Sequence, residues 1–365
     1  MRLQGLKLGL GVGLLLATGC GQLWRPFLEA SSCEPSANCA TEDLSVPTEP
    51  PMVVWSKQGP PNGLAADLYA VAAGADNEVM VGGDNGTFWR YKAGGAWSSP
   101  LAVNSKRVRS LYTHGQGQSW AAGDAATVQV WNGTGWARNP PPGTLYPSLS
   151  SIWVDPQKSI WTVGSSNTIY VFNGITGGWG SMPSPGPAGE TLTAVTGAGP
   201  YLRWLASDHA TVYQWDGAAF STLPATPTVV RSMWAASETE LWVAGDAGMI
   251  LRRTTAGWEP QALPGLVSAR RINSIVGNGQ GKLWAVGEGG LVLHFDGSRW
   301  RLEDAATTVE LTAVSVPLGR EDAWLVGLQS TIRYRAPSLP VVLLDLGVPS
   351  DLPTVDLSKS DFPVL

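Results

Sequence analysis

Residues 282–300 read KLWAVGEGGLVLHFDGSRW, and this stretch decides the fold. An apolar run ends at Gly287, a short polar turn follows, and a second apolar run leads to Asp296-Gly297 before Trp300 opens a third. Glycine and Asp-Gly pairs mark tight turns, and short apolar runs between such turns are typical of β-strands. The stretch therefore predicts strand, turn, strand, turn, strand.

The same pattern recurs along most of the chain. The residue at the Gly287 position recurs at spacings of 41, 41, 43, 38, 42 and 40, namely at Gly82, Gly123, Gly164, Ser207, Gly245, Gly287 and Gly327. Three residues before the marker the first unit has Val79, and each of the other six has a tryptophan. These are Trp120, Trp161, Trp204, Trp242, Trp284 and Trp324. Seven units of about 40 residues have the size of four-stranded propeller blades.

A second repeated aromatic shows how the ring closes. It follows the marker by 13 or 15 residues in six units, as Trp97, Trp136, Trp179, Phe220, Trp258 and Trp300, and is missing from the last. Trp55 supplies it, because Trp55 precedes Gly82 by 27 residues and the other aromatics precede their next marker by 25 to 29. We predict an all-β, seven-bladed β-propeller of four-stranded blades, closed by an N-terminal strand around Trp55 that completes the last blade. The repeated tryptophans are expected to pack between blades.

The N-terminus carries an export signal. Arg2 and Lys7 precede an apolar run of nine residues, which is too short to span a membrane. The sequence Ala17-Thr18-Gly19-Cys20 follows this run. This ending resembles the lipobox of bacterial lipoproteins, which implies that residues 1–19 are removed and that Cys20 carries the lipid. Gly21 is not the aspartate that retains such proteins in the inner membrane, so we expect an outer-membrane anchor in a bacterial envelope. The alternative is an ordinary signal peptide with an incidental cysteine.

Two further segments flank the propeller, which is predicted over residues 51–336. Residues 20–50 are rich in Ser, Pro, Glu and Thr and predict a flexible tether. Cys33 and Cys39 within it can form a small disulfide after export, or remain free thiols. Residues 337–365 form a tail with acidic-apolar pairs, which is either loosely packed or a docking peptide.

Composition excludes some functions. The chain has 365 residues, 44% of them hydrophobic and only 15% charged, so it can bury a large core and is not a disordered protein. Removal of Arg2 and Lys7 leaves 22 basic residues against 29 acidic ones, a formal charge of −7. That balance argues against nucleic acid as a partner.

One face of the propeller is the candidate binding site. Turns between the second and third strands carry Asp84, Asp124, Asp208, Asp246 and Glu288. Connections between blades, expected on the same face, carry Arg107, Arg109, Arg231, Arg270 and Arg271. We predict a polar funnel that binds a peptide or glycan, with Arg109, Arg231 and Arg271 beside the carboxylates. The alternative is that the acidic residues bond their own turns and the arginines pair locally.

No catalytic set is recognisable. The three histidines, His114, His209 and His294, lie in different units and not at metal-ligand spacing from cysteines or carboxylates, so we predict neither metal nor cofactor. A phosphate-binding loop and a nucleophile elbow are also missing from the sequence.

The repeats resemble known families. Trp284-Ala285-Val286-Gly287 with Asp296-Gly297 and Trp300 is similar to repeats of seven-bladed propellers related to photosystem II assembly factors and to sialidase-type (BNR) repeats. The sialidase aspartate box is not met, because the turns between third and fourth strands are shorter, as at Asp216-Gly217. Thr168-Ile169-Tyr170 and Thr211-Val212-Tyr213 look like strands of tectonin-like lectins. Such propellers host enzymes, lectins and scaffolds alike.

These observations favour a monomeric, non-enzymatic, lipid-anchored scaffold or assembly factor that grips an envelope protein with one face. A surface lectin is the alternative, and a glycosidase or lyase is third, because no acid-base pair can be named.

Overall fold

The computed structural model describes residues 54–59, 66–92, 94–98, 104–113, 117–143, 145–265, 267 and 269–337. The predicted signal peptide, the tether, Cys20, Cys33, Cys39, His114 and all but the first residue of the tail lie outside these residues. No helix in the described part of the chain is long and apolar enough to span a membrane.

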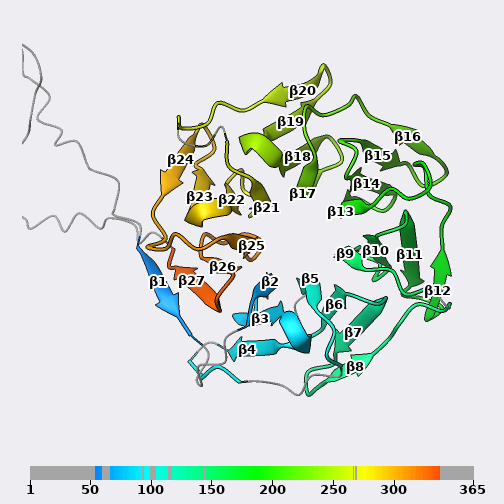
Figure 1. Cartoon of the computed structure of the whole chain (residues 1–365), viewed down its shortest axis with the longest axis horizontal. Helices are drawn as coiled ribbons and strands as arrows, with labels where there is room; N and C mark the ends of the chain where they lie inside the picture. The colour runs from blue at the N-terminus through cyan, green and yellow to red at the C-terminus, as the bar shows by residue number, and fades with distance from the viewer. Residues whose placement is uncertain are drawn as a thin grey trace, which may run out of the picture. The chain divides into compact units, whose positions relative to one another are not determined.

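Seven small antiparallel sheets stand around a common centre, as the sequence predicts (Figure 1). We number the blades 1–7 in chain order of their innermost strands. Blade 1 contains β2 (Leu68–Ala73), β3 (Glu78–Gly83) and β4 (Phe88–Lys92), and blade 2 contains β5 (Val108–Thr113), β6 (Ser119–Gly123), β7 (Thr127–Trp131) and β8 (Trp136–Arg138). Blade 3 contains β9 (Leu149–Val154), β10 (Ile160–Gly164), β11 (Thr168–Asn173) and β12 (Gly178–Ser181). Blade 4 contains β13 (Leu192–Ala198), β14 (Leu202–Ser207), β15 (Val212–Trp215) and β16 (Phe220–Thr222).

Blades 5–7 follow the same plan. Blade 5 contains β17 (Val230–Ser237), β18 (Glu240–Gly245), β19 (Ile250–Thr254) and β20 (Gly257–Pro260). Blade 6 contains β21 (Ile272–Gly277), β22 (Leu283–Gly287), β23 (Leu291–Phe295) and β24 (Trp300–Glu303). Blade 7 contains β25 (Leu311–Ser315), β26 (Ala323–Gly327), β27 (Thr331–Arg335) and β1 (Trp55–Gln58). Three single 3-10 turns, η1 (Asp84–Gly86), η2 (Asp246–Gly248) and η3 (Glu288–Gly290), join second to third strands.

The closure of the ring by the N-terminal strand is confirmed. β1 pairs with β27 in an antiparallel ladder that runs from Trp55 opposite Arg335 to Gln58 opposite Ile332, in the sheet order β1-β27-β26-β25. Figure 1 shows the blue β1 beside the orange-red β27. In blade 1 the fourth strand is reduced, among the described residues, to one bridge between Ser98 and Arg90.

The repeated tryptophans pack between neighbouring blades. Trp242 of blade 5 meets Trp300 of blade 6 edge to face, with ring centroids 6.2 Å apart, and Trp324 of blade 7 meets Trp97 of blade 1 in the same way at 5.9 Å. Trp284 is fully buried. These contacts confirm that the tryptophan repeat belongs to the core, where edge-to-face pairs add stability beyond the buried area.

A β-bulge interrupts every innermost strand one residue after its start. In blade 6, for example, Ile272 pairs with Gly287 and Ser274 with Val286, which leaves Asn273 without a partner. The marker glycine allows this, because a Cβ at Gly287 would lie 2.0 Å from the carbonyl oxygen of Arg271. Hence the glycine recurs because two backbones approach closely there.

The bulges also correct the first copy of the repeat. Leu68 pairs with Gly83, not with Gly82, and the N–H of Asp84 bonds the carbonyl oxygen of Asp67 at 2.9 Å, as the N–H of Glu288 bonds that of Arg271. The marker of blade 1 is therefore Gly83, and Met80 takes the tryptophan position. Because Gly82 and Gly83 are adjacent, the sequence alone does not show which of them is the marker.

Candidate functional site

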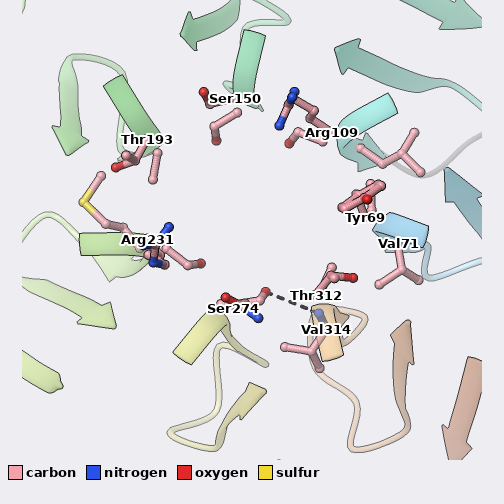
Figure 2. Close-up of a pocket in the computed structure, with 18 of the residues that line it drawn as sticks. Tyr69, Val71, Arg109, Ser150, Thr193, Arg231, Ser274, Thr312 and Val314 are labelled. Carbon is pink, nitrogen blue, oxygen red and sulfur yellow. Dashed lines mark hydrogen bonds between the residues drawn. The ribbon is translucent and has the colours of Figure 1, made fainter. Parts of the chain in front are cut away.

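The seven bulges turn seven polar side chains into the centre of the ring. A bulged residue is unpaired, and its side chain is aimed away from the regular ladder. The bulged residues are Tyr69, Arg109, Ser150, Thr193, Arg231, Asn273 and Thr312. Together with Arg271 and Glu310 they line a cavity of about 350 Å³, which we call the polar mouth. Figure 2 shows the labelled members around an open centre.

The position before the bulge and the one two residues after it are apolar in every blade. The residue before it is buried in every blade: Leu68, Val108, Leu149, Leu192, Val230, Ile272 and Leu311. Two residues after it the strands carry Val71, Leu111, Ile152, Val195, Met233, Ile275 and Val314. The fold thus constrains its neighbours but leaves the bulged position free to differ from blade to blade.

Three arginines of the candidate face bond a carboxylate at the same face. The Nε atoms of Arg107, Arg109 and Arg231 lie 2.5 Å from an oxygen of Asp84, Asp124 and Asp246 respectively. Arg231 makes a second bond through Nη2 to Asp246 at 3.0 Å. The structure therefore brings these predicted residues together in local pairs, which was the alternative to an open binding site.

Arg271 belongs to a larger network. Its Nη2 bonds Glu310 at 2.5 Å, its Nε bonds Asn273 at 3.0 Å, and the amide of Asn273 also donates to Glu310 at 3.0 Å. Within the described part of the chain, the carboxylate of Glu288 accepts one hydrogen bond, from the backbone N–H of Arg271 at 3.3 Å.

Some of these contacts shift the pKa of their members. Burial alone would raise the pKa of Asp124, but the hydrogen bond and charge of Arg109 outweigh it and lower that pKa. The same balance lowers the pKa of Glu310 through Arg271 and Asn273. The bond to Glu310 raises the pKa of Arg271, and the bond to Asp84 raises that of Arg107. The mouth is thus strongly polar without a large excess of either charge.

Two predicted residues lie elsewhere than expected, and several members of the mouth were missed. Arg109 and Arg231 lie inside β5 and β17, not in the connections between blades. Tyr69, Ser150, Thr193, Asn273 and Thr312 line the mouth and were not among the predicted residues. The sequence does contain a pattern that indicates them. In each unit an apolar residue at the start of the inner strand is followed directly by a polar residue that differs from unit to unit.

Asp208 stands apart from the other aspartates. In other blades the paired arginine stands either at the bulge of the same blade, as Arg109 does, or just before the inner strand of the next blade, as Arg107 does. The corresponding residues near Asp208 are Thr193 and Val229. Its carboxylate instead lies 3.0 Å from Nδ1 of His209, and the N–H of Thr191 donates to it at 3.1 Å. Arg270 has no side-chain ion pair among the described residues.

The far side of the central cavity has a different character. About 590 Å³ of space there is lined by the apolar inner-strand residues and by Tyr112, Trp153 and Trp234. Trp153 and Trp234 are half-buried, and the guanidinium of Arg203 stacks over the Trp153 ring at 4.5 Å. The two ends of the cavity thus offer a polar and an aromatic lining.

No protein-family model and no curated protein matches this sequence. Solved propeller structures do match the fold. Virginiamycin B lyase from Staphylococcus aureus superposes with a TM-score of 0.67 at 15% identity, covering 78% of this chain and 99% of that one. YCF48 bound to the D1 peptide gives 0.63 at 15% identity, covering 78% and 97%. The WD40 repeats of RRP9 give 0.63 at 10% identity, covering 77% and 100%. At these identities the likeness concerns the fold alone.

Proposed function

We propose that this protein is a non-enzymatic scaffold of the bacterial envelope, held at the outer membrane by a lipid on Cys20, which binds a protein partner at the polar mouth. The observation that carries the proposal is the ring of seven bulged side chains. Every blade presents one polar group at its bulge, on a frame in which the position before the bulge and the one two residues after it are apolar in every blade. Groups fixed on such a frame lose little entropy when they bind.

The chemistry of the mouth suits an extended peptide segment. Arg109 uses only Nε to bond Asp124, so its two Nη groups have no bond to another described residue. Hydroxyls of Ser150, Thr193 and Thr312 and the amide of Asn273 add donors and acceptors around it. Guanidinium groups bind carboxylates and carbonyl oxygens well, and the carboxylate partners keep the rim from attracting nucleic acid.

Propellers of related fold support a protein partner. YCF48 is known bound to a peptide, and WD40 repeats share the architecture. The virginiamycin B lyases share it too. Because no acid-base pair can be assigned at the polar mouth, we prefer binding to catalysis.

The test is partner capture by the full chain in its membrane. Crosslinking followed by purification is expected to retain one stoichiometric protein, and Arg109→Glu with Arg231→Glu should lower its yield at least about tenfold, since like charges then meet in the mouth. A matched variant, Arg138→Glu with Arg299→Glu, changes the same charge on exposed residues away from the mouth. Equal capture by both variants would refute the proposed site.

A second candidate, glycan binding, is favoured by the aromatic end of the cavity. Half-exposed indole rings such as those of Trp153 and Trp234 can stack on sugar rings. A glycan array probed with the full chain would show a defined sugar specificity that Trp234→Ala abolishes and the arginine variant leaves unchanged. Protein capture without any glycan signal would favour the scaffold.

A further inference from the structure

Blade 4 carries a cluster of three metal-ligating side chains on the same face as the polar mouth. Glu190 precedes β13, and Asp208 and His209 form the turn between β14 and β15. One ligand atom from each lies within 4.8 Å of the others. The Nδ1 atom of His209 is 3.0 Å from Oδ1 of Asp208 and 3.5 Å from Oε1 of Glu190.

Within the described chain, this cluster lacks the arginine that pairs with the aspartates of other blades. Asp84, Asp124 and Asp246 each have an arginine. Asp208 has none among the described residues, and its neighbour is a second carboxylate. Glu190 is 1% exposed, and among the described residues the only hydrogen-bond donor to its carboxylate is the hydroxyl of Tyr213, at 3.0 Å and 3.2 Å from the two oxygens. A cation bound here would stabilise both carboxylates, in addition to the His209 imidazole that contacts each of them.

The spacing of the ligand atoms fits a metal ion. Ligands about 2.0–2.2 Å from zinc at tetrahedral or octahedral angles lie roughly 2.9–3.6 Å apart. The two distances from His209 fall in this range. Carboxylates and one imidazole form an N/O ligand set that suits a borderline ion such as Zn²⁺ better than Ca²⁺ or Mg²⁺.

The surroundings orient the two carboxylates. The Tyr213 hydroxyl contacts both carboxylate oxygens of Glu190, at 3.0 Å and 3.2 Å. The N–H of Thr191 donates to Asp208. Hydrogen bonds of this kind fix ligating groups and their loss weakens metal binding. Because the side chains of Asp208 and His209 are 42% and 63% exposed, an ion there can reach solvent.

We propose that Glu190, Asp208 and His209 form a binding site for one divalent transition-metal ion of the Zn²⁺ class, with Tyr213 positioning Glu190. The site lies at the rim of blade 4, and its existence does not depend on partner binding at the polar mouth.

The experiment titrates the full chain, purified in detergent after treatment with chelator, with Zn²⁺ and with Co²⁺. A background with Cys20→Ser, Cys33→Ser and Cys39→Ser removes thiolates that would compete for the metal. We expect one equivalent of Zn²⁺ by calorimetry. Co²⁺ should give the visible absorption of a site with nitrogen and oxygen ligands, without a thiolate charge-transfer band.

Variants identify the ligands. His209→Ala and Asp208→Asn should each weaken Zn²⁺ binding at least about tenfold, and Tyr213→Phe should weaken it about tenfold. Asp246→Asn, at the equivalent position of blade 5, should leave it unchanged. Circular dichroism of the metal-free variants checks that they fold, which the exposure of Asp208 and His209 favours. Absence of stoichiometric binding, equal binding by His209→Ala, or tighter binding of Ca²⁺ than Zn²⁺ would each overturn the proposal.

Discussion

At the scale of single residues, the marker glycine is required by a close approach between backbones. Six of the seven blades have glycine there, and in each an added Cβ would lie 1.9 to 2.4 Å from the carbonyl oxygen that precedes the inner strand. Normal van der Waals contact needs more than 3 Å. In these six blades the backbone must therefore shift to admit a side chain, whereas blade 4 holds Ser207 at this position and keeps its bulge.

Gly287→Ala tests this requirement. We expect a loss of about 2–4 kcal/mol in the free energy of unfolding, because the clash is with a carbonyl oxygen of the backbone and not with a movable side chain. Urea denaturation measures the effect. Gly135→Ala is the matched control, since nothing lies within 4 Å of a Cβ there. Equal stability of the two variants would contradict the role assigned to the marker.

The structure places His294 in the interior, 8% exposed, with its ring stacked on Trp284 at 4.6 Å. Its Nδ1 lies 3.2 Å from Glu303. This residue therefore belongs to the packing of one blade seam, and its difference from other copies has a structural cause.

At the scale of elements, that seam joins the closing strand to its neighbours. Glu303 at the end of β24 accepts the indole N–H of Trp55 in β1 at 2.9 Å. It also lies 3.3 Å from Nε of Arg335 in β27, a buried ion pair without hydrogen-bond geometry. One carboxylate thus links blade 6 to both outer strands of blade 7.

The seam should make stability depend on pH. Burial would raise the pKa of Glu303, but the hydrogen bond with His294, the charge of Arg335 and the bond from Trp55 hold it below its ordinary value. A carboxyl with a lowered folded pKa contributes stability above its unfolded pKa of about 4.3, and loses that contribution as the pH falls through the folded value.

Glu303→Gln is the corresponding variant. At pH 7 we expect it to be less stable by about 3 kcal/mol, because Arg335 is left buried without a counter-charge. The difference from the parent chain should shrink between about pH 5 and pH 3. Melting temperatures of both proteins across this range provide the measurement, and a difference independent of pH would refute the assignment.

At the scale of the whole molecule, stability depends on a contact between the two ends of the propeller. The ladder of β1 with β27 joins residues about 277 positions apart, and Trp55 is buried at 5% exposure. Without β1, blade 7 would have an open edge and the seam with blade 6 would lose Trp55. Closure of the ring removes that exposed edge.

Two truncations separate the strand from the tether. Deletion of residues 1–50 should leave the free energy of unfolding unchanged, whereas deletion of residues 1–59 should lower it by at least about 3–5 kcal/mol, the usual cost of losing one buried tryptophan. Chemical denaturation of the two soluble products measures the difference. Matching unfolding curves would show that the ring does not depend on β1.

The sequence by itself determined the seven blades, the packing role of the tryptophans and the closure by Trp55. These features repeat, and each follows from strand period and turn chemistry within about 40 residues. It also brought Arg109 and Arg231 together with Asp124 and Asp246 on one face. The predicted anchor at Cys20 and the Cys33–Cys39 disulfide remain predictions.

Only the tertiary structure decided which side chains meet. A bulge shifts one residue out of the ladder, and this displacement, invisible in the spacing of apolar residues, converts Tyr69 and Asn273 into members of the polar mouth. The pairing of Glu303 with Trp55, and of Glu190 with His209, depends on how separate strands and connections fold against each other. Repetition specifies the frame, whereas three-dimensional packing of non-repeated residues specifies the sites.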